Sequence, residues 1–387
     1  MRQTTALERF ERLWLAKAFL REFVLFYPVY ALYMADRGVT PAAYGALLAA
    51  WALTVLLAEV PSGVLADRFS RRALLMVGGG LRGAGFLLWW LLPDVTGFAL
   101  GFVLWGLGSA AESGANEALL YETLVELDAA EQLERILGRG EASGGIAVLL
   151  ALGAGGFVAQ HGIGWVAGAS AAAAIAHTGI VYAGLREPVR ASASRSSRLI
   201  AVRGLAGVAG SLALRRALLA CVLVTAYFGA LDEFFAPLLG DLLAQDLRVV
   251  GTALAGLYLC RAIGLAGAHR VRSRLGIWMA ALWGVIALLV GTLIGGAAAT
   301  LAGLAVFAFA FGVAEVLTSA ALQRAITGDS RATLTSLAGL GQELLSLVAF
   351  VFVGALAQAT DWRTSFVALA CGGLALIVSA AVYRARW

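Results

Sequence analysis

The chain has 387 residues, of which 61% are hydrophobic and only 14% are charged, and its net charge is +5. Charged residues make up about a quarter of a typical soluble domain. This composition therefore excludes an ordinary soluble protein.

Apolar runs of membrane-spanning length recur along the whole chain. Each run is long enough to cross roughly 30 Å of hydrocarbon as a helix. Long continuous runs favour helices over a spanning β-barrel, whose strands would show short alternating patterns. The sequence predicts an all-α membrane protein with twelve transmembrane helices, at 14–35, 43–64, 73–92, 96–121, 138–160, 163–185, 216–239, 248–269, 276–296, 298–322, 332–357 and 362–383.

Most of the 29 basic residues lie in the predicted loops on the side of the N-terminus, whereas the opposite loops hold only Arg37, Arg248 and Arg363. The positive-inside rule then predicts a multi-pass protein of the cell (inner) membrane with both termini in the cytoplasm. Because the net charge follows from this topology, we expect no nucleic-acid partner.

Residues 63–72, between the second and third predicted helices, read Gly-Val-Leu-Ala-Asp-Arg-Phe-Ser-Arg-Arg. Such a charged cluster is expected at a water interface, because each bare charge costs several kcal/mol in hydrocarbon. The spacing Gly-x-x-x-Asp-Arg-x-x-Arg-Arg resembles the loop between helices 2 and 3 of major facilitator superfamily transporters. The resemblance implies a secondary transporter that works by alternating access.

In that family the residues matching Gly63, Asp67, Arg68 and Arg72 lock the cytoplasmic side. Glu59 lies close to the loop and Arg71 lies within it, so we expect both to contribute. The alternative is that these charges only anchor the topology. The predicted cytoplasmic gate comprises Glu59, Gly63, Asp67, Arg68, Arg71 and Arg72.

A polar stretch at 186–215 contains Pro188 and a Ser/Ala/Arg segment, which is typical of a linker. A short interfacial helix at 199–214 is a further expectation. The predicted organisation is an N-terminal six-helix bundle (1–185), a cytoplasmic linker (186–215) and a C-terminal six-helix bundle (216–387).

The two predicted bundles repeat each other weakly. The sequence Gly-Ala-Asn-Glu at 114–117 recurs as Gly-Val-Ala-Glu at 312–315, and 156–160 recurs as 354–358 at the same offset. A shared offset indicates duplication, and the resemblance implies two pseudo-symmetric bundles with the substrate site between them near mid-membrane.

Charged residues inside the predicted helices are the best functional candidates, because unpaired charge at that depth is costly. Arg21 and Glu22 lie at a depth similar to that of Glu112, so we expect an Arg21–Glu112 or Arg21–Glu22 contact. Glu117 follows Glu112 by five residues and cannot share its helix face. The predicted proton-coupling and substrate cavity comprises Arg21, Glu22, Tyr30, Glu112, Glu117, Asp232, Glu233, Glu315, Gln342 and Glu343.

Among these residues Glu22, Glu112, Asp232 and Glu343 are the candidate proton carriers, and static ion pairs are the alternative. Arg82 and Arg261 are available cationic partners. His177 is expected to be a packing histidine rather than a proton relay.

Aromatic residues are frequent in the first predicted helix, where Phe19, Phe23, Phe26 and Tyr30 follow a helical stripe. The stripe predicts either an aromatic wall for an amphipathic substrate or simple helix packing. Trp89 and Trp90 are expected to lie in an interfacial belt.

The segment 113–124, Ser-Gly-x-x-Glu-Ala-x-x-Tyr-Glu-Thr-Leu, resembles a fourth-helix pattern of multidrug-like members of the family. Two features depart from proton-driven drug exporters: the fourth helix has no arginine, and the fifth has no Gly-Pro pair.

We predict a proton-coupled exporter of small amphipathic molecules, with a small-molecule substrate, protons and the lipid bilayer as partners. The alternatives are an uptake symporter for a small anion or nutrient, a lipid flippase on the same fold, and a non-transporting receptor. The sequence holds no phosphate-binding glycine loop, metal motif or nucleophile–base pair, so we expect no enzymatic activity, cofactor or metal. A monomer is the family expectation.

Overall fold

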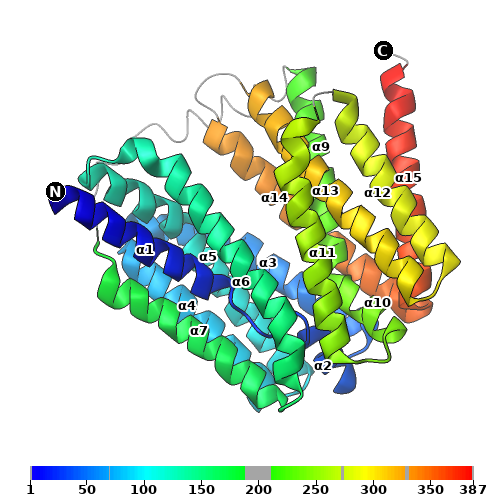
Figure 1. Cartoon of the computed structure of the whole chain (residues 1–387), viewed down its shortest axis with the longest axis horizontal. Coiled ribbons are helices and arrows are strands. Elements are labelled where there is room, and N and C mark those ends of the chain that lie inside the picture. The colour runs from blue at the N-terminus through cyan, green and yellow to red at the C-terminus, as the bar shows by residue number, and fades with distance from the viewer. Residues whose placement is uncertain (1, 69, 188–210, 272–273, 327–330, 386–387) are drawn as a thin grey trace. The chain divides into compact units, whose positions relative to one another are not determined.

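The computed structural model describes residues 2–68, 70–187, 211–271, 274–326 and 331–385, and all regular structure within them is helical (Figure 1). In this part of the chain ten helices are long and apolar enough to cross a membrane, and Trp362–Ile377 is a shorter apolar helix. The all-α prediction is therefore confirmed, whereas the number of twelve stays a prediction.

The chain divides into two compact units. The first comprises 1–39, 46–193 and 247–252, and the second comprises 40–45, 194–246 and 253–387. In the first half of the chain the helices are α1 (Arg2–Glu22), α2 (Tyr30–Asp36), α3 (Pro41–Arg68), α4 (Arg71–Leu91), α5 (Val95–Glu126), η1 (Ala130–Gln132), α6 (Leu133–Ala159) and α7 (Ile163–Gly184).

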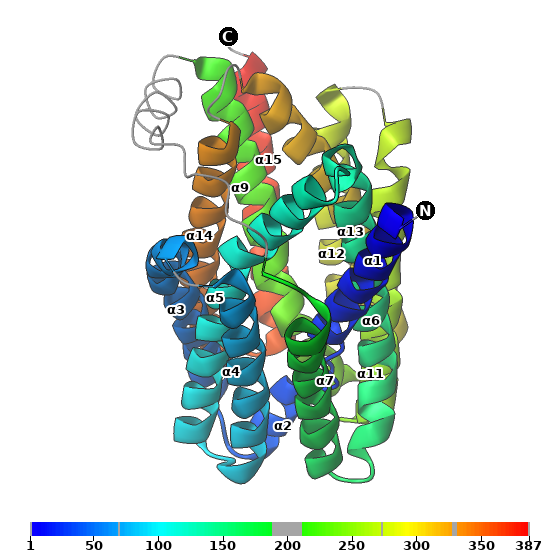
Figure 2. The ribbon, with the colours of Figure 1, turned by 90° about the vertical axis from the view of Figure 1, so that its left-hand side faces the viewer.

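In the second half of the chain the helices are α9 (Leu212–Leu231), η2 (Asp232–Phe234), α10 (Phe235–Leu242), α11 (Leu247–Gly267), η3 (Ala268–Arg270), α12 (Arg274–Ile294), α13 (Ala297–Ala325), α14 (Arg331–Ala359) and α15 (Trp362–Ala385). Within the first unit α4 packs against α5 and α7, and α1 packs against α6 and α7 (Figure 2).

The first predicted helix, 14–35, is not continuous. Helix α1 ends at Glu22, a stretch of turns follows, and α2 begins at Tyr30. Pro28 explains the break, because it lacks a backbone N–H and its ring clashes with the carbonyl four residues earlier. That carbonyl, on Val24, instead accepts a hydrogen bond from the backbone N–H of Tyr27 at 3.1 Å.

The predicted helix 216–239 is interrupted in the same manner. Helix α9 passes into the short η2 and then into α10, which contains Pro237. A proline at this position leaves the carbonyl of Glu233 without its helical donor. Within the second unit that carbonyl accepts a hydrogen bond from the hydroxyl of Tyr44 at 3.0 Å.

Two expectations about polar segments also change. The predicted loop at 63–72 is mostly helical, because α3 continues to Arg68 and α4 starts at Arg71 after an N-cap at Ser70. The expected interfacial helix at 199–214 lies largely outside the described residues, and Leu212–Leu214 already belong to α9.

Three glycines of α6 lie close to α1 and to the break that follows it. A Cβ atom on Gly140 would lie 3.0 Å from the indole nitrogen of Trp14, and one on Gly144 would lie 3.1 Å from Cγ of Glu22. At Gly155 it would lie 2.6 Å from the ring of Pro28. Small residues on α6 therefore let the broken segment pack closely against it.

Candidate functional site

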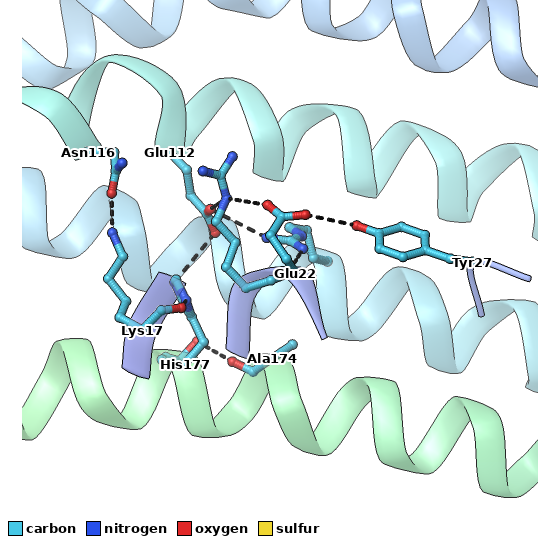
Figure 3. Close-up of polar contacts among 10 residues, drawn as sticks. Lys17, Glu22, Tyr27, Glu112, Asn116, Ala174 and His177 are labelled. Atoms are coloured by element: carbon cyan, nitrogen blue, oxygen red, sulfur yellow. Dashed lines mark hydrogen bonds and ion pairs between the residues drawn. The ribbon is translucent and has the colours of Figure 1, made fainter. Parts of the chain in front are cut away.

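A cluster of buried charged side chains lies inside the first unit, where α1, α4, α5 and α7 meet (Figure 3). Its centre is Glu112 on α5, whose side chain is 1% exposed. Nε of Arg21 lies 2.9 Å from Oε2 of Glu112 and 3.5 Å from Oε1 of Glu22. Both contacts predicted for Arg21 are thus present in the structure.

Arg82 on α4 is the second cation at Glu112, with Nη1 3.5 Å from Oε2. Its Nη2 donates to the backbone carbonyl of Arg21, in the last turn of α1. The last carbonyls of a helix have no partner within the helix, and a cation there also complements the helix dipole. Arg82 therefore caps α1 where the first membrane segment breaks.

His177 on α7 completes the surroundings of Glu112. Its side chain is 1% exposed, and Nε2 lies 3.6 Å from Oε1 of Glu112. On the other side of the ring, Nδ1 lies 3.2 Å from the backbone carbonyl of Lys17. Because a carbonyl can only accept, Nδ1 carries the hydrogen, and the neutral ring leaves Nε2 as an acceptor.

Lys17 lies one turn before Arg21 on α1 and is 1% exposed. Its ammonium donates to Oδ1 of Asn116 on α5 and lies 3.9 Å from the centroid of the Trp14 ring. Among the described residues no carboxylate oxygen forms an ion pair with it. Lys17 thus differs from Arg21 and Arg82, which both contact Glu112.

A small cavity, partly open to solvent, adjoins these residues, and the roughly 370 Å³ of empty space at this position includes the open solvent at its mouth. Its buried end is lined by polar side chains, and small residues of α6 form one wall. The lining residues are Trp14, Lys17, Ala18, Arg21, Glu22, Asn116, Leu137, Gly140, Glu141 and Gly144.

Tyr27, within the break, joins the charged cluster to an aromatic surface. Its hydroxyl donates to Oε2 of Glu22 at 3.2 Å (Figure 3). Its ring lies 6.0 Å from that of Trp105, which lies 6.0 Å from that of Trp51. We call Tyr27, Trp51 and Trp105, all partly exposed, the aromatic wall.

Two of the other predicted aromatic residues, Tyr30 and Trp89, belong to the core of the first unit, whereas Trp90 is 46% exposed. Tyr30 is 5% exposed and packs against Trp89 and Phe102. Trp89 is 0% exposed, and its indole N–H donates to the carbonyl of Phe98 at 3.1 Å. The prediction that Trp89 lies in an interfacial belt is therefore wrong, because this side chain finds its polar partner inside the bundle.

The second unit holds a separate ion pair. Nη2 of Arg261 lies 2.8 Å from Oε2 of Glu315, and its guanidinium lies 4.8 Å from the centroid of the Phe228 ring. Asp232 and Glu233 occupy η2, at the break between α9 and α10. Both residues belong to the second unit, whereas Glu112 belongs to the first.

The remaining predicted cavity residues lie on α5 and α14. Glu117 is exposed on α5, away from the face that carries Glu112. Gln342 and Glu343 are half-buried on α14, and a Cβ atom on Gly229 would lie 3.9 Å from Nε2 of Gln342. The repeat-related Glu117 and Glu315 therefore have different surroundings.

Two of the predicted gate residues make contacts within the first unit. Arg71 forms an ion pair with Glu122, and Arg72 donates to the carbonyls of Val181 and Tyr182 at the end of α7. The Glu187 carboxylate accepts from the backbone N–H groups of Arg71 at 2.9 Å and Arg72 at 3.0 Å. Backbone N–H groups in the first turn of a helix have no acceptor within the helix, so Glu187 caps the N-terminus of α4.

Glu59 is half-buried on α3, and its backbone carbonyl accepts from the hydroxyl of Ser62 at 2.9 Å. The side chains of Asp67 and Arg68 lie outside the described residues, and so do the surroundings of Gly63. Within the described part of the chain no group of three or more His, Cys, Asp or Glu side chains could hold a metal ion.

Sequence reasoning missed Lys17, Asn116 and Tyr27. The available signal was the spacing of four, which places Lys17 with Arg21 on one face of α1 and Asn116 with Glu112 on one face of α5.

The model of the Major Facilitator Superfamily matches residues 18–326. No curated protein matches the sequence. Among solved structures, the fold is similar to that of a mutant form of the nucleoside transporter NupG, with 13% identity, 96% of this chain and 98% of that chain covered, and a TM-score of 0.79.

Two other solved structures show the same fold. A bacterial homologue of the human lysosomal transporter Spinster, inward-facing and occupied, has 15% identity and a TM-score of 0.76, over 100% of this chain and 97% of that one. A POT family transporter in complex with 5-aminolevulinic acid has 12% identity and a TM-score of 0.68, with 97% of this chain and 94% of that chain covered.

Proposed function

The chain belongs to the major facilitator superfamily, and from this premise we propose that it is a proton-coupled secondary transporter that exports small amphipathic molecules by alternating access. It is a membrane transporter by family and not an enzyme. Proton coupling, export and the substrate class are our proposal. We also propose that the chain crosses the membrane twelve times, with the first and seventh crossings interrupted, and that both termini are cytoplasmic.

One observation carries the proton coupling: Nε2 of His177 and Oε1 of Glu112 face each other at 3.6 Å. With the ring neutral and the carboxylate ionised, both atoms are acceptors, and neither has a hydrogen-bond partner in the described part of the chain. One proton placed between them would satisfy both. Ionisable residues at membrane depth commonly mark proton pathways.

The charged groups around this pair come from two helices, α1 and α4. Arg21 and Arg82 contact the other oxygen of Glu112, and Lys17 offers its carbonyl to His177. Because Arg21 is 30% exposed, the cluster has a route to water. A proton bound at the centre can therefore exchange with solvent through a shift of Arg21.

The aromatic wall supports the amphipathic substrate. Tyr27 links the wall to Glu22, so an apolar surface adjoins a charged one. The buried indole N–H of Trp51 has no hydrogen-bond partner among the described residues and offers a donor to a ligand. Sites for small molecules typically combine aromatic walls with a few polar groups.

The test uses purified protein in liposomes with a trapped pH-sensitive dye and an imposed pH gradient. Amphipathic compounds of matched size and different charge are added in turn. We expect solute-triggered proton flux in the wild type and loss of that flux in Glu112→Gln, while exposed Glu131→Gln stays active. Proton flux that is equal in Glu112→Gln and the wild type would contradict the proposal.

A second candidate, an uptake symporter for a small anionic solute, is favoured by Lys17, which lacks a carboxylate partner among the described residues. The same liposomes distinguish the two, because the direction of the pH gradient that drives accumulation is opposite for symport and for export.

We also propose that Glu59, Gly63, Asp67, Arg68, Arg71 and Arg72 form a cytoplasmic gate. The contacts of Arg71 with Glu122 on α5 and of Arg72 with the end of α7 support the gate, because they join the start of α4 to two neighbouring helices. Asp67→Asn should shift the population toward the inward-facing state. Unchanged accessibility of single cysteines on the outer side would count against the gate.

A further inference from the structure

Lys17 is the only lysine in the sequence, and it lies almost completely inside the first unit. Burying an ammonium group is costly unless a charged or strongly polar partner compensates it. The ammonium contacts the amide oxygen of Asn116 and the face of Trp14. Both contacts are favourable, but neither supplies a negative charge.

Lys17 lacks an anionic partner because of the residues that α1 and α5 present to each other. Lys17 and Arg21 are four residues apart on α1, and Asn116 and Glu112 are four apart on α5, so each pair shares a helix face. Arg21 meets the carboxylate of Glu112. Lys17 instead meets the carboxamide of Asn116 (Figure 3). The Lys17–Asn116 contact therefore has the geometry of an ion pair, but Asn116 carries no negative charge.

The sum of the formal charges in the buried cluster also indicates a missing anion. Lys17, Arg21 and Arg82 are cationic, Glu22 and Glu112 are anionic, and His177 is neutral when its Nε2 is an acceptor. One positive charge is left over. Glu141 also lines the cavity, but its side chain is exposed, where solvent and salt weaken its effect on Lys17.

Lys17 and Arg21 both line the cavity described above, and so does Asn116. Because Oδ1 of Asn116 accepts from Lys17, its amide nitrogen remains as a donor. Glu22 is already engaged by Arg21 and Tyr27. The buried end of the cavity is therefore rich in donors and carries one uncompensated positive charge.

We propose that this cavity binds the carboxylate of a small amphipathic organic acid, with the anion held by Lys17, Arg21 and Asn116. A carboxylate carries the single negative charge that the cluster lacks. The apolar part of the acid would contact Trp14 and Leu137, which line the same cavity. This proposal names the substrate class and rests on the transporter function proposed above, in either direction of transport.

The test measures binding by calorimetry to the full-length protein in nanodiscs at pH 7. Three matched sets of ligands are used, each with one skeleton carrying a carboxylate, an amide or an amine: phenylacetate, indole-3-acetate and decanoate with their counterparts. We expect at least one carboxylate to bind roughly tenfold or more tightly than its amide and its amine, as expected for a charge-assisted hydrogen bond.

The decisive variant is Asn116→Asp, which supplies an internal carboxylate to Lys17 with almost no change in shape. It should weaken carboxylate binding about 10- to 100-fold, because the ligand then competes with a fixed ion pair. Lys17→Met should have a similar effect, and Lys17→Arg should retain binding. Gln160→Glu makes the same chemical change at an exposed site and is the matched control.

The proposal is overturned if no carboxylate binds more tightly than its amide and amine, including the case in which none binds. It is also overturned if Asn116→Asp binds carboxylates as the wild type does. Failure here is distinguishable from failure of the transporter function. Proton flux triggered by amines or neutral compounds in the liposome assay would leave transport in place and remove only the carboxylate site.

Discussion

Nε2 of His177 lies 3.6 Å from Oε1 of Glu112, and both side chains are 1% exposed. The backbone carbonyl of Lys17 fixes the hydrogen of His177 on Nδ1, so the neutral ring turns a lone pair toward the carboxylate. Two facing acceptors in a buried site are unfavourable, and a bound proton removes the conflict. In the proton coupling proposed above, the proton-binding unit is therefore the His177–Glu112 pair rather than either residue alone.

His177→Gln should abolish solute-coupled proton flux while leaving the protein folded. Glutamine can still hydrogen-bond to the carbonyl of Lys17, but its amide cannot take up a proton at neutral pH. The measurement is pH-dye flux in liposomes. His161→Gln, at an exposed turn of the same unit, is the control. Wild-type coupling in His177→Gln would show that this histidine only packs, as the sequence suggested.

Arg82→Met should destabilise the first unit by about 3 kcal/mol or more, because it removes one partner of a buried ion pair. It also leaves the carbonyl of Arg21 at the end of α1 without its donor. Arg82→Lys should recover only part of the loss, since one ammonium cannot reach both groups as the guanidinium fork does.

The measurement for Arg82 is the thermal unfolding midpoint in detergent. Arg37→Met is the control, because the Arg37–Asp36 pair spans 3.9 Å at the surface and such pairs contribute little. A midpoint for Arg82→Met equal to that of Arg37→Met would contradict the capping role.

The sequence predicted the parts of this protein that depend on composition and local periodicity. Apolar runs gave the all-α membrane class, and equal depth in the membrane predicted the contacts of Arg21 with Glu22 and Glu112. The spacing of four offered a signal for the Lys17–Asn116 contact, but the partner of His177 was not predictable, because it depends on how α5 and α7 rotate against one another. Tertiary packing, which a single sequence does not show, decides those rotations.

Both helix breaks had a sequence signal that the length of the apolar runs concealed. Pro28 and Pro237 each remove a backbone donor inside a run long enough to span the membrane. A run of that length favours one continuous helix unless the freed carbonyl has another donor. Tyr44 supplies one at Glu233, and this contact across a long sequence separation could not be read from the sequence.

Gly155→Ala should destabilise the first unit by about 1–3 kcal/mol, the usual cost of overpacking. The added methyl group would contact the carbonyl of Leu25 and lie 2.6 Å from Cγ of Pro28, both in the break after α1. Gly153→Ala, two residues earlier on α6, has no atom within 4 Å of its new Cβ and should be neutral or slightly stabilising. Equal unfolding midpoints for the two variants would show that the break does not need this close approach.

Asp361 caps the N-terminus of α15 and gives a pH dependence whose sign follows from its hydrogen bonds. Its Oδ1 accepts from the backbone N–H of Thr364 at 2.8 Å and its Oδ2 from the Thr364 hydroxyl at 2.7 Å, which together hold the pKa of Asp361 below its ordinary value. A depressed pKa adds stability that is fully present above the ordinary value, near 3.9, and is lost as the pH falls through the lower folded value.

Asp361→Ala should cost about 1 kcal/mol at pH 7, as for other lost N-caps, and Asp361→Asn should cost less. The difference in unfolding midpoint between wild type and Asp361→Asn should shrink as the pH falls from 5 toward 3, because only the wild-type side chain titrates. A difference that stays constant over this range would show that the charge of Asp361 does not contribute to the cap.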